Sequence, residues 1–424
     1  MLSVFLWLKT SSLVRQRIDF PSVMNPFDRQ TNNPITNNSS HTINEKGARS
    51  SAIKFSFPLP LMRAILLILL FSVSLQSFAQ LGGSSTYSFL DMTSSARNAA
   101  MGGDQIAIKD GDLDMLYLNP SILDTSMHMY LATDFTNYYG DINYGYIGYA
   151  HNFEKIGMMG FGVMYANYGD FTRADLNGTI QGSFSANETL LHATYARGFG
   201  KYFSTGANVK LIYSQLADYN SFGIAADLAA TFYHPKTNWT ISLVARNLGS
   251  QLKPYVAGQY EAIPLSLDLG VSHKLKYIPL RLSMTIVDLQ RPNLAYIDPT
   301  NSPPAVDPLT GEVTVQKVNV GDAIMRHFIF STELTIAKRI MLRAGYNYGR
   351  RQEFKVASRP GTVGFSWGIG IKVNRFMISY SRATYHLAGG TNQISIMTNL
   401  GTHIKMPKRV RKEKNDKDKP TTDG

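Results

Sequence analysis

The chain has 424 residues, of which 44% are apolar and 17% charged, with no cysteine and a formal net charge of +12. This length suits two or three soluble domains or one large barrel. Without cysteine there is no disulfide, no thiolate metal site and no acyl-cysteine lipoprotein anchor, so any membrane attachment has to come from the fold itself.

Residues 1–61 form a polar lead that is rich in Asn and Ser between Asn25 and Ser51 and shows no sustained periodicity. A segment typical of a signal peptide occupies 62–79. Because such a peptide works only at an N-terminus, we interpret the lead as the result of a start site placed too far upstream, with Met62 as the true initiator. The alternative is a genuine disordered extension.

The signal peptide prediction rests on three regions. Arg63 supplies the positive region, residues 64–73 the apolar region, and Ser-Phe-Ala at 77–79 a small-x-small cleavage site. The alternative is a transmembrane anchor, but an apolar stretch this short covers only about half of a bilayer core of roughly 30 Å. We therefore expect export, with cleavage between Ala79 and Gln80.

Removal of this leader changes the charge balance. From Gln80 onward the chain carries 34 Lys and Arg against 27 Asp and Glu, and four of the seven excess positive charges lie beyond residue 404. The rest of the chain is nearly neutral. It lacks the concentrated basic face that nucleic-acid binding requires, so no nucleic-acid partner is expected.

Residues 80–126 differ in character from the long segment C-terminal to them, because their small residues and charges do not alternate as they do in a lipid-facing strand. We predict that this segment is a hatch that sits inside the barrel or at its mouth. The residues singled out as its structural motif are Arg97, Gly102, Gly103, Asn119 and Pro120.

Residues 127–404 form a series of segments with two-residue alternation, which predicts strands. In FSWGIGIKV, for example, Trp367 and Ile369 share one face while Gly368 and Gly370 share the other. The predicted strands are 127–137, 142–151, 156–168, 185–199, 202–216, 221–234, 237–249, 263–276, 279–289, 327–338, 339–349, 363–374, 375–385 and 392–403. We expect an all-β fold, a transmembrane antiparallel β-barrel of about 14 strands with an N-terminal hatch.

The connections between these strands alternate in length. Tight turns follow even-numbered strands, whereas the longer connections, at 169–184, 250–262, 290–326 and 350–362, follow odd-numbered ones. Short periplasmic turns and long outside loops are typical of barrels in the outer membrane of gram-negative bacteria, where lipid would surround the chain. The Pro-rich stretch 290–326 is predicted to be an outside loop that contributes to partner binding; the alternative is a floppy surface insertion.

The tail at 405–424 holds eight Lys and Arg against four Asp and Glu. We expect a disordered periplasmic end, as charge runs of this kind usually are. The alternative is a contact with an acidic periplasmic partner or with peptidoglycan.

No catalytic, cofactor or metal site is predicted. Ser-x-x-Lys occurs at 51–54 and 250–253, but the first match precedes the cleavage site, the second falls in a predicted outside loop, and the Lys-Thr-Gly strand of acyl-enzymes is absent. The nine histidines are scattered. The acidic run 110–114 lacks the remaining ligands of a calcium loop. We expect no enzyme activity.

Several hatch residues together resemble the PorQ family, outer-membrane components of the type IX secretion system. They are the opening Gln-Leu-Gly-Gly at 80–83, Phe89-Leu90, the Ser-Ala-Arg and Met-Gly-Gly of 95–103, the Asp-rich stretch 110–114 and Asn119-Pro120. The resemblance is specific only in the hatch, and the lead and the basic tail depart from it. It implies a fourteen-stranded barrel similar to PorV and the FadL-like transporters.

The resemblance also implies partners. Members of the family belong to the surface attachment complex with PorU, PorV and PorZ, hold the surface protein PorZ, and serve the cleavage and display of secreted cargo. The alternative function is a FadL-like outer-membrane channel for uptake of hydrophobic molecules. A channel would need an apolar pocket beside the hatch, whereas a docking barrel would need large ordered outside loops.

Overall fold

The computed structural model describes residues 85–138, 142–175, 177–295, 305–306, 313–314, 319–355, 361–386 and 389–402. The predictions for the lead at 1–61, the signal peptide at 62–79, the cleavage site at Ala79 and Gln80, and the tail at 405–424 lie outside these residues. The loop predicted at 290–326 is described only in part.

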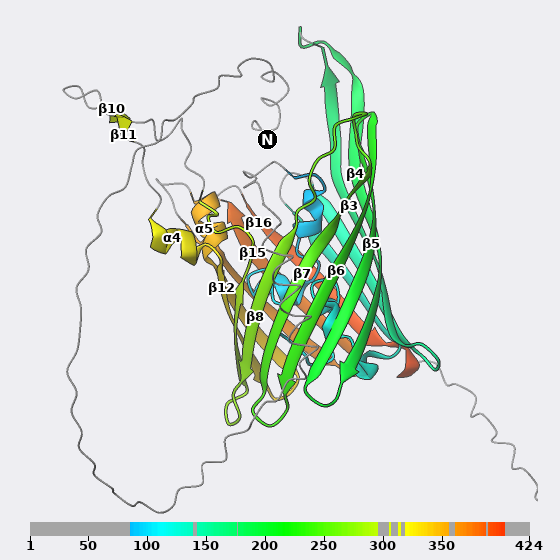
Figure 1. Cartoon of the computed structure of the whole chain (residues 1–424), viewed down its shortest axis with the longest axis vertical. Coiled ribbons are helices and arrows are strands. Elements are labelled where there is room, and N and C mark those ends of the chain that lie inside the picture. Colours follow the sequence, from blue (N-terminus) through cyan, green and yellow to red (C-terminus); the bar gives the residue numbers. More distant parts are fainter. Residues whose placement is uncertain are drawn as a thin grey trace, which may run out of the picture. The chain divides into compact units, whose positions relative to one another are not determined.

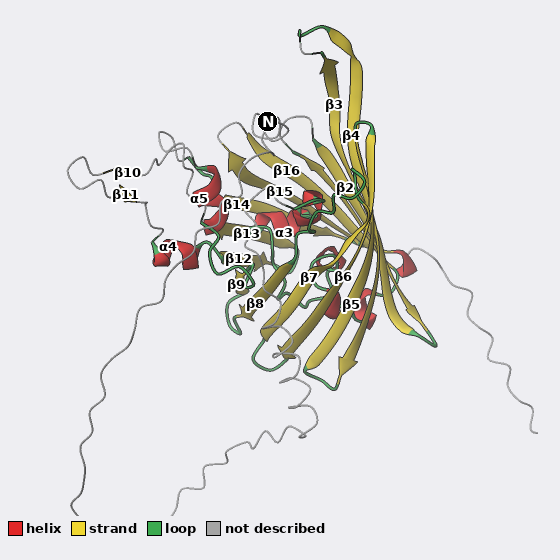
Figure 2. Ribbon diagram, turned by 45° about the horizontal axis from the view of Figure 1, so that its top comes forward, coloured by secondary structure: helices red, strands yellow, loops and turns green. Residues whose placement is uncertain are grey.

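The prediction of a 14-stranded antiparallel barrel is confirmed: the strands close into one ring in which β1 pairs with β16 (Figures 1 and 2). A separate pair, β10 (Ala305–Val306) and β11 (Val313–Thr314), lies outside this ring. The ring strands are β1 (Tyr130–Asn137), β2 (Asn143–Phe153), β3 (Gly157–Ala174), β4 (Ile180–Phe199), β5 (Phe203–Leu216), β6 (Tyr219–His234), β7 (Trp239–Lys253), β8 (Ser266–Lys274), β9 (Leu280–Ile286), β12 (Phe328–Ile336), β13 (Ile340–Asn347), β14 (Phe365–Val373), β15 (Phe376–His386) and β16 (Gly389–Asn399).

Residues along each strand alternate between the inner and the outer face of the ring. Buried lumen-facing residues alternate with exposed residues, and the exposed set is largely apolar, including Leu191, Leu211 and Trp367. Such an outer face suits lipid, and lipid cannot hydrogen-bond a free strand edge. On β14, Trp367 is 52% exposed, while a Cβ atom on Gly368 would lie 2.6 Å from the Ala100 Cβ in the hatch. Gly370 faces the lumen as well, against Arg343.

The two ends of the barrel differ. Short connections at 154–156, 200–202, 235–238, 275–279, 337–339 and 374–375 lie at the end where β1 begins and β16 ends, with Tyr130 paired to Asn399. We call this the turn end. The opposite, loop end carries the connections at 254–265, 287–327 and 348–364, which include α4 (Val320–Met325) and α5 (Tyr348–Phe354).

Two predictions about loops are wrong. The connection predicted at 169–184 is largely strand, because β3 runs on to Ala174 and β4 begins at Ile180. Neither strand buries a residue there, so water on both faces removes the alternation from which strands are predicted. Ser250 and Lys253, expected in a loop, belong to β7. The pairing of β7 with β6 shifts its register near these residues, which disturbs the two-residue alternation there.

The hatch threads the barrel with short helices joined by extended stretches: η2 (Ser88–Asp91), α3 (Ala96–Ala100), η3 (Leu113–Met115), η4 (Pro120–Ile122) and η5 (Thr125–Met127). A last turn, η6 (Leu400–Thr402), follows β16. Within the described part of the chain, no helix is both long and apolar enough to cross a membrane.

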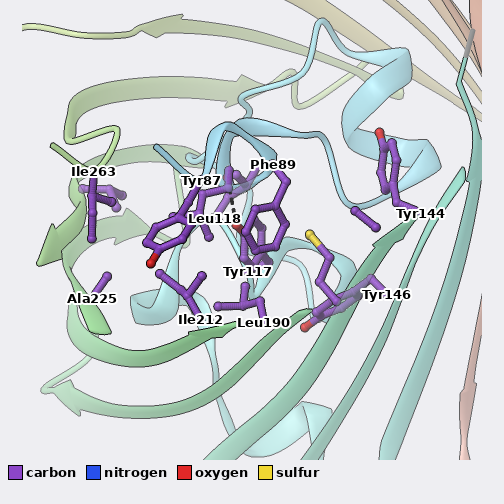
Figure 3. Packing of buried hydrophobic residues seen from close by; sticks show 14 of the residues in the cluster. Tyr87, Phe89, Tyr117, Leu118, Tyr144, Tyr146, Leu190, Ile212, Ala225 and Ile263 are labelled. Carbon is purple, nitrogen blue, oxygen red and sulfur yellow. Dashed lines mark hydrogen bonds between the residues drawn. The ribbon is translucent and has the colours of Figure 1, made fainter. Parts of the chain in front are cut away.

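The core of the molecule lies in the lumen, between the hatch and the inner face of the barrel. Tyr87, Phe89 and Tyr117 from the hatch pack against Tyr146 and Ile212 from the wall (Figure 3). A second buried cluster joins Met101, Ile108 and Leu116 to wall residues such as Met158. The hatch therefore takes the place that the core occupies in a soluble protein.

Candidate functional site: the hatch and its attachment to the wall

Arg97 is the centre of the attachment. It belongs to α3, which Ser95 caps by accepting a hydrogen bond from the Asn98 N–H. The guanidinium lies 2.8 Å from Asp110, 2.6 Å from Asp112 and 2.7 Å from Glu333 on β12. Burial makes these charge-assisted contacts strong and makes the loss of any partner costly. One hatch residue thus joins two parts of the hatch to the wall.

Arginines of the wall complete this network. Arg343 donates to Glu333 at 2.8 Å, and Arg281 donates to Asp110 at 2.8 Å. Burial by itself would raise the pKa of Asp110, but Arg97 and Arg281 hold that pKa well below its usual range. The carboxylate therefore stays ionised and paired under physiological conditions.

Gly102 and Gly103 form the turn that leaves α3. Both have positive φ, +99° and +117°, which disfavours any residue with a side chain. A Cβ atom on Gly102 would lie 2.5 Å from Cγ2 of Ile329 on β12. From the other side, a Cβ on Gly345 of β13 would lie 2.4 Å from the Met101 carbonyl carbon. The hatch backbone is pressed directly against the wall.

Asn119 and Pro120 fasten the hatch elsewhere on the ring. The Asn119 side chain donates to the Ile106 carbonyl at 2.6 Å and to Thr231 of β6 at 3.1 Å, and it accepts from the Ser121 N–H at 2.9 Å. A Cβ on Gly206 of β5 would lie only 2.4 Å from the Pro120 carbonyl carbon. The motif residues therefore contact the barrel wall at two separate places, β12–β13 and β5–β6, and do not converge on one centre.

Further attachment residues were not predicted as a group. Arg246 of β7 bridges Asp268 at 2.7 Å and the hatch residue Asp104 at 3.2 Å. Lys210 of β5 pairs with Asp227 at 2.8 Å and lies 4.7 Å from the Tyr117 ring centre. The available signal was a charged residue on the lumen-facing side of a predicted strand.

Two kinds of cavity occur among the described residues. The spaces around Arg281 and around Arg246, inside the ring, are lined largely by charged side chains. The apolar ones are grooves on the outer wall, the larger of about 560 Å³ between β16, β1, β2 and β3. Within the described ranges, no three His, Cys, Asp or Glu side chains are arranged to hold a metal ion.

No protein-family model matches the chain, and no curated protein matches it. Similar solved structures include the toluene transporter TodX of Pseudomonas putida, with 13% identity, a TM-score of 0.44, and coverage of 72% of this chain and 97% of TodX. The monoaromatic hydrocarbon channel CymD has 13% identity and a TM-score of 0.40, covering 72% of this chain and 96% of CymD. A FadL homologue of Pseudomonas aeruginosa has 9% identity and a TM-score of 0.39, covering 72% and 98%.

All three of these solved structures are between 9% and 13% identical to this chain. Their similarity to this chain concerns the fold. The function is therefore argued from the chain's own geometry.

Proposed function

We propose that this chain is a docking barrel of the type IX secretion system in the outer membrane, which holds a PorZ-like surface protein beside PorU and PorV. The choice of secretion system rests on the resemblance of the hatch residues to the PorQ family. The docking role rests on one structural observation, the long hairpin of β3 and β4.

The hairpin extends beyond the rest of the barrel as a free ribbon, made of residues 169–174 and 180–185 (Figure 1). A strand of 18 residues such as β3 spans about 60 Å, whereas about 9–11 residues cross a membrane. No residue of the ribbon is buried in this chain. It rises from the loop end, which faces the cell exterior in bacterial barrels.

The ribbon is ordered by contacts within the hairpin and by one ion pair with the next turn of the same end. The rings of Phe171 and Phe184 stack with centres 5.2 Å apart, and Arg173 bridges Asp218 of the neighbouring β5–β6 turn at 2.6 Å. At the tip, Asp175 accepts hydrogen bonds from the Asn177 and Thr179 N–H groups, each at 2.9 Å. A preorganised surface loses little entropy on binding a partner.

The test replaces residues 170–185 by an Asn-Gly turn, which suits a two-residue hairpin. We expect normal barrel assembly, measured by the heat-sensitive gel mobility of folded barrels, and loss of the PorZ-like partner in a pull-down from outer membranes. The control replaces the exposed residues 256–260, at the same end of the barrel, by a Gly-Ser linker. A further variant replaces residues 291–321 in the same way to test the predicted binding loop.

Retention of the partner by both the ribbon variant and the 291–321 variant would contradict docking at the loop end. Loss of the partner from the 256–260 control as well would show that the ribbon is not the specific contact.

A second candidate function, uptake of hydrophobic molecules, is favoured by the apolar groove on the outer wall beside Gly145. Such a channel also needs an apolar cavity in the lumen, whereas the lumen cavities around Arg281 and Arg246 are lined mainly by charged side chains. Uptake of a labelled fatty acid by cells with and without the protein separates the two functions. Uptake that depends on the protein but not on the ribbon would favour the channel.

A further inference from the structure

The turn end of the barrel carries an uneven distribution of charge. Three of its turns each carry two basic residues in or next to the turn and no acidic one: Lys274 and Lys276 at the β8–β9 turn, Lys338 and Arg339 at the β12–β13 turn, and Lys372 and Arg375 at the β14–β15 turn. We call these six residues the basic arc.

The three turns are neighbours along the rim. The Thr335 N–H donates to the Pro279 carbonyl at 2.8 Å, and the Lys372 N–H donates to the Arg339 carbonyl at 2.7 Å. Backbone hydrogen bonds thus link each turn to the next. Paired basic residues are therefore concentrated along this part of the rim, whereas the β4–β5 and β6–β7 turns hold one lysine each, Lys201 and Lys236.

Four residues of the arc line the mouth of the lumen. Lys274, Lys338, Lys372 and Arg375 border a cavity of about 280 Å³ whose floor includes the Arg97 network. Lys274 and Lys372 occupy lumen-facing positions, in step with the buried Ser272 and with Gly370. Their charges are therefore directed to the aqueous mouth and not to the lipid-facing side of the wall.

The positive charges at the mouth differ from those of the floor in their pairing. The arginines of the floor, Arg97, Arg281 and Arg343, are balanced by Asp110, Asp112 and Glu333. Among the described residues, no ion pair involves Lys274, Lys338 or Lys372. Four like charges beside a partly enclosed cavity create a positive potential that attracts an anion.

Arg375 is engaged within the chain, because it donates to the carbonyl of Thr402. Lys274, Lys338 and Lys372 are therefore the cations of this mouth that are best placed to meet a ligand.

We infer that the mouth at the turn end is a binding site for an acidic peptide segment of a periplasmic protein. The turn end faces the periplasm in bacterial barrels. A cavity of this volume accommodates a few side chains rather than a folded domain, and carboxylates match its lysines in charge. Anionic lipid is the less suitable ligand because the charges face the lumen.

The test measures binding of fluorescein-labelled hexaglutamate to the full chain in detergent micelles by fluorescence anisotropy, with hexaglutamine as the neutral probe. The triple variant K274Q/K338Q/K372Q is compared with K155Q/K201Q/K236Q, which removes exposed lysines from three other turns of the same rim. Both retain the basic tail, so a difference between them reports on the mouth.

We expect salt-sensitive binding of hexaglutamate that weakens about tenfold or more in the first variant and changes little in the second. Folding of both is checked by heat-sensitive gel mobility. Equal affinities of the two variants, or equal binding of hexaglutamine, would overturn the proposal. Vesicles containing phosphatidylglycerol serve as competitor, and displacement of the peptide by the vesicles would assign the charges to lipid instead.

Discussion

Arg97 joins charged groups that come from distant parts of the sequence. Its partners Asp110 and Asp112 follow within the hatch, but Glu333 lies 236 residues further along the chain. Because Arg97, Asp112 and Glu333 are buried, the energy of each of their contacts depends on the presence of the others. Arg97 therefore contributes strongly to the attachment of the hatch to the wall.

Replacing Arg97 by Gln should destabilise the protein by about 3–5 kcal/mol, because the buried carboxylate of Glu333 and those of the hatch lose their shared cation. The measurement is denaturant unfolding of the detergent-solubilised protein. Arg197→Gln is the control, since Arg197 is exposed on β4. A change of under about 1 kcal/mol at Arg97 would show that the other arginines suffice.

Gly206 gives a steric test of the same attachment. Gly206→Val places a side chain where the Pro120 backbone lies, so we expect the hatch to be displaced and protease cleavage within 85–129 to accelerate. Gly198→Val is the matched control, because a Cβ at Gly198 meets no atom within 4 Å. Equal protease resistance of both variants would contradict the close contact.

At the scale of elements, the membrane-spanning strands were predictable because each has a lipid face and a lumen face. β14 illustrates this, with Trp367 outward and Gly368 against the hatch. The ribbon was not predictable in the same way, since both faces of residues 169–174 meet water and no alternation is imposed. Hatch contacts escaped prediction for another reason: nothing local in the sequence indicates that Gly206 meets Pro120.

The outer face of β14 should not tolerate a charge. Ile369→Arg should cost about 2–4 kcal/mol if the residue lies near the membrane midplane. Ser183→Arg is the control, because Ser183 is exposed on the ribbon and meets water. Folding into lipid vesicles and subsequent urea titration measure both. Equal tolerance of arginine at the two positions would refute the assignment of faces.

At the scale of the whole molecule, the filled lumen determines what crosses the barrel. Buried side chains from both the hatch and the wall occupy the interior, and charged networks hold them there. A docking function does not require an open pore, so a fixed hatch and an exposed ribbon are compatible in one protein.

We therefore expect planar bilayers containing the protein to show no steady ion conductance, whereas Gly206→Val should conduct because its hatch is displaced. Gly198→Val is again the control and should remain closed. Steady conductance in the unaltered protein would show that water and ions pass beside the hatch.

The seam between β1 and β16 has a consequence for biogenesis. Tyr130 pairs with Asn399, so the ring cannot be completed until nearly the whole described chain has been delivered to the membrane. The hatch precedes the ring in sequence, yet its Ala96 N–H donates to Ser395 on the last strand at 2.8 Å. Insertion of the final hairpin and enclosure of the hatch are thus a single late event with high contact order. A nascent barrel that closes without the hatch inside would have no route by which to recover it.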